Sequence, residues 1–169
     1  LAWLLGAPQS RVAAGAGATG ACAGMAWITV LFWRLLVQSR AADQLHARLV
    51  GLAFVVGGCC VAGLAACTWL GEWGWARHFV LTALWGFAVL VFVTVAHRML
   101  PFFSPPGPHG DHPWGGLGVL VAAVGFEGLA VWVDALSAGD VPWAGGWIGL
   151  RAALELACGT LLLWRAWGW

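Results

Sequence analysis

The stretch FVLTALWGFAVLVFVTVA, residues 79–96, decides the fold of this chain. It contains no charged residue, and its length approaches the ~20 residues that a helix needs to cross the apolar core of a bilayer. His78 and His97 bracket the stretch, so polar groups stand where an apolar core would end. A helix is favoured in lipid because it satisfies its own backbone hydrogen bonds. The stretch therefore predicts a membrane-spanning helix.

Four further apolar runs lie on either side of this one. Residues 12–33 and 49–70 carry no charge, and residues 114–133 and 147–164 carry few. None of the runs shows the alternation of apolar and polar residues that is typical of a strand. Spanning helices are expected near residues 12–36, 49–70, 78–99, 114–135 and 146–166. The predicted fold is an all-α, polytopic membrane helix bundle with about five transmembrane helices.

The composition agrees with a lipid bilayer as the environment. The chain is 62% hydrophobic and 9% charged, whereas a soluble domain needs far more charge to cover its surface. Many of its fourteen tryptophans fall at the ends of the predicted spans, where indoles are favoured at the headgroup level. A net charge of +1 offers no basic patch for nucleic acid. The chain also lacks the P-loop and nucleophile motifs of NTPases and hydrolases.

We expect one transmembrane helical domain over residues 1–169. The chain begins with Leu1 instead of Met, and its first apolar residues stop at Gly6 and Pro8. These features favour a fragment of a longer chain, in which an earlier span ends here.

The arginines predict which side of the membrane each loop faces. Five of them lie on one side of the predicted bundle: Arg34, Arg40, Arg48, Arg98 and Arg165. Only Arg11 and Arg77 lie on the other side. Because arginine is enriched in cytoplasmic loops, the first loop and the C-terminus are expected in the cytoplasm.

The histidines are candidate ligands for a metal. His46 and His97 end adjacent spans on the same predicted side, so they could share one ion. His78 lies on the opposite side, roughly 28 Å from His97 along the same helix at 1.5 Å per residue, and cannot join it. Imidazole at a span end suits haem (heme) iron or copper. The alternative for each histidine is an interfacial side chain wetted by headgroups, and this stays open.

A second histidine pattern occurs in the proline-rich segment after the third predicted span. His109, Asp111 and His112 stand close together in the sequence. Two imidazoles and a carboxylate can hold a divalent metal, although such short clusters are also common in solvated loops. We favour the solvated loop.

Besides Arg165 at the very end of the last span, four ionisable residues lie within the last two predicted spans: Glu127, Asp134, Arg151 and Glu155. Glu127 and Asp134 are one heptad apart and share a helix face. Arg151 and Glu155 are four residues apart and can pair. Because ionisable groups in a membrane face the bundle interior and find partners, we expect a contact between Glu127 and Arg151. A proton or ligand path is the functional alternative.

The end of the third predicted span, FVTVAHRMLPFF at residues 92–103, resembles the NnrS family of bacterial membrane proteins. The family has an apolar span that closes in a similar R-x-x-P-F-F-T pattern. Arg98, Pro101, Phe102 and Phe103 match it, and Ser104 replaces the threonine. The family is larger, with about twelve spans, and its histidine-rich N-terminal segment and its later Arg/Gly/His motif are not recognisable here. Pro101 is expected to end the helix, with Leu100 already leaving it.

The resemblance implies a multi-pass protein of the bacterial inner membrane that is associated with haem and copper. It implies a role in nitric oxide response or respiratory redox chemistry, and leaves open whether the chain is an enzyme. His97, Arg98, His46 and His78 are then the cofactor-binding candidates. His97 and His46 would be the metal ligands, and Arg98 would pair with a haem propionate or another anion.

A different class of function also fits the sequence. The chain could be a cofactor-free or pigment-associated accessory subunit that packs among other membrane subunits in a larger respiratory or photosynthetic complex. Its tryptophans and small residues would then serve packing against partner helices and lipid.

Overall fold

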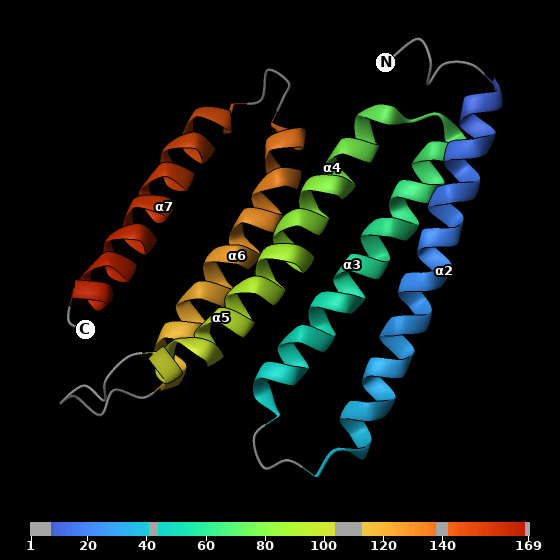
Figure 1. The fold of residues 1–169 in the computed structure, drawn as a ribbon. Helices are drawn as coiled ribbons and strands as arrows, with labels where there is room; N and C mark the ends of the chain where they lie inside the picture. Colours follow the sequence, from blue (N-terminus) through green and yellow to red (C-terminus); the bar gives the residue numbers. More distant parts are fainter. Residues whose placement is uncertain (1–7, 41–43, 104–112, 138–141, 168–169) are drawn as a thin grey trace. The chain divides into compact units, whose positions relative to one another are not determined.

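The computed structural model describes residues 8–40, 44–103, 113–137 and 142–167. The elements in these ranges are all helical (Figure 1): α2 (Pro8–Gln38), α3 (Leu45–Leu70), α4 (Trp73–Ala83), η1 (Leu84–Val89), α5 (Leu90–Phe103), α6 (Pro113–Leu136) and α7 (Ala144–Trp167). The short π-helix η1 joins α4 directly to α5. Five helices of the described chain are long and apolar enough to cross a membrane. The prediction of an all-α, multi-pass membrane protein is confirmed.

The observed helices extend beyond the predicted spans. α3 begins at Leu45 instead of residue 49, and the third span begins at Trp73 instead of residue 78. Hydropathy marks the apolar core of the membrane, whereas a helix continues into the headgroup region where polar side chains are solvated. The first turn of α3 therefore includes His46 and Arg48, which the hydropathy pattern excluded.

The prediction that Pro101 ends the third helix is wrong. α5 continues through Pro101 to Phe103. Proline has no backbone N–H, so it cannot donate to the carbonyl of His97 four residues earlier. The missing hydrogen bond costs less stability in the last turn of a helix than in its interior, because few helical hydrogen bonds follow Pro101.

By its internal contacts the chain divides into two compact units, Leu1–Val91 and Phe92–Trp169. The first unit contains α2, α3, α4 and η1, which pack by placing aromatic rings against glycines. A Cβ atom added at Gly15 would lie 2.7 Å from the ring of Trp69, and one added at Gly63 would collide with Phe79. Glycine at these positions permits a close approach of neighbouring helices.

The π-helix η1 lies where the third span meets α3. The backbone N–H of Leu90 contacts the carbonyl of Trp85, five residues back, which is the π-helical spacing. A Cβ atom added at Gly86 would lie 2.7 Å from Val56 of α3. The Phe54 ring of α3 lies 5.3 Å from the Phe87 ring of η1, centroid to centroid. The wide turn of the π-helix η1 therefore lies where the third span packs closely against α3.

The second unit contains α5 from Phe92 onward, α6 and α7. α6 and α7 contact each other, and no residue from Ala144 to Trp164 in α7 is buried in the described structure. Large apolar side chains of α7 are exposed, including Ile148 and Leu156. This is the surface expected of a helix that faces lipid or another membrane helix.

Candidate functional site

The two predicted metal ligands lie near helix ends in different units. His46 is in the first turn of α3 and is half-buried. His97 is in α5 and is also half-buried, and Arg98 next to it is exposed. Because His46 belongs to the first unit and His97 to the second, a metal shared by the two stays a prediction.

His78 has the best defined geometry of the three described histidines. Its Nδ1 lies 3.0 Å from the carbonyl oxygen of Gly74, one turn earlier in α4. A carbonyl oxygen only accepts, so Nδ1 donates its hydrogen and the lone pair is left on Nε2. Metal-binding histidines commonly donate their second N–H in this way. The ring of Trp75 lies 5.6 Å away and lines the same side of α4.

No group of three or more His, Cys, Asp or Glu side chains suited to a metal ion occurs among the described residues. The candidate cluster of His109, Asp111 and His112 lies outside them. A haem iron needs only one or two imidazoles, so the donor chemistry of the described histidines still fits haem.

The indole of Trp33 is a feature that the sequence did not distinguish from other tryptophans at span ends. Its ring covers Gly51 of α3, where an added Cβ atom would lie 3.1 Å away. Its Nε1–H is buried and has no hydrogen-bond partner among the described residues. A buried donor of this kind near the start of α3 costs free energy unless a partner accepts from it.

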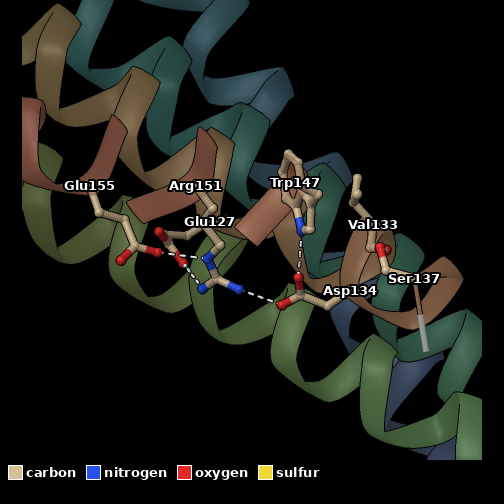
Figure 2. Close-up of polar contacts among 7 residues, drawn as sticks. All are labelled: Glu127, Val133, Asp134, Ser137, Trp147, Arg151 and Glu155. Carbon is tan, nitrogen blue, oxygen red and sulfur yellow. Dashed lines mark hydrogen bonds and ion pairs between the residues drawn. The ribbon is translucent and has the colours of Figure 1, made fainter. Parts of the chain in front are cut away.

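The most extensive polar contacts in the described chain join α6 to α7 (Figure 2). Arg151 of α7 donates from Nη2 to Glu127 of α6 at 2.8 Å. It also donates from Nε to Glu155 at 2.6 Å and from Nη1 to Asp134. The indole Nε1 of Trp147 donates to the second oxygen of Asp134 at 2.7 Å. We refer to these five residues as the Arg151 network.

The Arg151 network extends over about half the length of the last two candidate spans. Glu127 and Glu155 lie near the middle of the spans Gly116–Leu136 and Ala144–Trp164. Asp134 lies close to the end of its span, next to the connection between α6 and α7. The network therefore runs from one end of these candidate spans to their middle, and carboxylates outnumber its guanidinium three to one.

The sequence predicted two of these four contacts and missed two, the bonds of Asp134 to Arg151 and to Trp147. The pairs Glu127–Arg151 and Arg151–Glu155 are confirmed. Trp147 stands at the start of the last predicted span, where the sequence pattern indicates only a tryptophan at a membrane boundary. Its signal was its position four residues before Arg151, which places both on one face of α7.

One protein family matches the chain over its whole length. The family model of the NnrS protein matches residues 1–169. The chain belongs to the NnrS family. This confirms the resemblance that residues 92–103 carry and extends NnrS membership to all five spans. Neither a curated protein nor a solved structure matches this NnrS-family chain.

Proposed function

We propose that this NnrS-family chain is a haem- or copper-associated protein of the bacterial inner membrane that acts in nitric oxide response or respiratory redox chemistry. The family match over residues 1–169 is the observation that carries the proposal. The three described histidines support it, because imidazoles at the ends of membrane spans have the donor chemistry that haem iron and copper require.

His97 and His46 are the proposed ligands at the predicted cytoplasmic side. Arg98 is exposed beside His97, and its long side chain can reach an anion at the interface, such as a haem propionate. The bound metal would supply one-electron redox chemistry or a site for nitric oxide. The protein would orient the metal centre and control the access of water to it.

His78 is the proposed ligand of a separate centre at the opposite side. The hydrogen bond from Nδ1 to Gly74 holds the ring and directs Nε2 as the ligating atom. One ligand near each end of the third span is compatible with two cofactors on opposite sides of the membrane.

An accessory subunit without a cofactor is the second candidate. The absence of buried residues from Ala144 to Trp164 favours it, because such a helix suits packing against another membrane subunit. The two functions differ in whether the purified protein carries a metal.

The test is an absorption spectrum and metal analysis of the protein purified from haem- and copper-replete bacterial membranes. We expect a Soret band that shifts on addition of dithionite, or stoichiometric copper. His97→Ala and His46→Ala should each lower the content at least about tenfold, and His109→Ala should leave it unchanged. A colourless, metal-free protein with native helicity would reject the proposal and leave the accessory subunit.

A further inference from the structure

The Arg151 network has an excess of carboxylates in a place where charge is expensive. Glu127, Asp134 and Glu155 all bond to one guanidinium, and no other basic residue takes part in the contacts that the structure describes. Two of these carboxylates lie near the middle of their spans. Ionisable groups at that depth are placed against partners and away from lipid, because the bilayer core solvates them poorly.

The network is also open to the surroundings on the surface of the α6–α7 pair. The side chain of Glu155 is 48% exposed and that of Arg151 is 31% exposed. On α7 the apolar side chains Ile148 and Leu154, one turn before and after Arg151, are exposed beside it. A polar centre with an apolar surround is the composition of a helix-docking surface inside a membrane.

The other described spans offer no cation at the matching depth. Each of their arginines lies within five residues of the end of its span: Arg11, Arg34, Arg48, Arg77 and Arg98. A second copy of the chain, docked by the same face, would add its own excess of carboxylates and would be repelled. Charge complementarity therefore points to a helix of another kind.

We propose that the face of α6 and α7 around Arg151 docks a partner transmembrane helix that carries a lysine or arginine near its middle. The partner's cation would lie beside Glu127 and Glu155 and balance the charge of the network. Its apolar side chains would cover Ile148 and Leu154 of α7. This interaction surface is independent of the haem or copper proposed above.

The test uses the full chain in phosphatidylcholine vesicles, with a fluorescence donor on a C-terminal tag. The probes are synthetic leucine-alanine helices of ~21 residues that carry an acceptor and differ only at the central position, which is lysine or leucine. We expect energy transfer to show about tenfold tighter association of the lysine peptide. The preference for the lysine peptide should be lost in the Glu155→Gln variant and also in the double variant Glu127→Gln/Glu155→Gln. Glu72→Gln, an exposed carboxylate outside the network, should retain it.

Several outcomes would overturn the proposal. Equal association of the lysine and leucine peptides would show that the network needs no further cation. A lysine preference that persists in the Glu127→Gln/Glu155→Gln protein would place the interaction elsewhere. Energy transfer between two labelled copies of the chain, lost in Glu155→Gln, would make a second copy the occupant. Circular dichroism of each variant establishes that its helices are intact, and Glu155→Gln alone suffices if the double variant does not fold.

Discussion

At Arg151 a single side chain holds two helices together. Its Nε, Nη1 and Nη2 atoms each bond to a different carboxylate, from Glu155, Asp134 and Glu127. Only the planar guanidinium has donors that diverge in this way, because an ammonium group is a compact point charge. The residue therefore has a role that depends on its shape as well as on its charge.

Replacement of Arg151 tests this role. Arg151→Leu is expected to lower the free energy of unfolding by roughly 3 kcal/mol, because the carboxylate of Glu127 loses its counter-charge in an apolar environment. Arg151→Lys should lower the free energy of unfolding by less, because lysine keeps the positive charge. It should still lower it, because the ammonium group lacks the divergent donors of the guanidinium. Titration with SDS in mixed micelles, followed by circular dichroism, measures the difference. Arg77→Leu, an exposed arginine of α4, is the control, and an equal loss there would contradict the role of Arg151.

At the scale of the helices, the first unit is assembled by aromatic rings that fill the space above glycines. Phe79 of α4 lies on Gly63 of α3, and Trp69 of α3 lies on Gly15 of α2. The same Trp69 donates from Nε1 to Thr19 at 3.1 Å, so it joins α3 to α2 by packing and by a hydrogen bond. In lipid, such close packing replaces the hydrophobic effect as the main attraction between helices.

Gly63→Ala tests the contact between α3 and α4. The new Cβ would overlap the ring of Phe79, so the helices must shift and the free energy of unfolding should fall by roughly 1–3 kcal/mol. Gly24→Ala in α2 is the matched control, because no atom lies within 4 Å of the added Cβ. It should be neutral or stabilising by up to about 1 kcal/mol, the helix-propensity difference. Thermal unfolding in detergent compares the two, and a similar loss at both positions would argue against the contact.

At the scale of the whole molecule, the arrangement of the arginines predicts the orientation in the membrane. Arg34, Arg40 and Arg48 lie in or beside the connection between α2 and α3, which is expected in the cytoplasm. The connection between α3 and α4, which contains Glu72, is then on the other side.

Cysteine labelling in intact cells checks this orientation. In a background with the five native cysteines replaced by alanine, Arg40→Cys should resist an impermeant maleimide until the cells are opened. Glu72→Cys should react from outside at once. The reverse pattern at the two positions would invert the predicted topology.

The sequence by itself determined the five spans, because hydropathy and length are local properties that do not depend on how helices pack. It also determined the pairs Glu127–Arg151 and Arg151–Glu155, since an ionisable group within a span needs a partner and the chain offers few. The donors of the predicted metal site, His46 and His97, could be chosen by residue type and span end, and their convergence stays a prediction. Only the tertiary structure decided that Asp134 and Trp147 join the Arg151 network, that Gly63 receives Phe79, and that the third span contains a π-helix. These features depend on the rotation and depth of one helix against its neighbour, which packing selects and no local pattern of residues records.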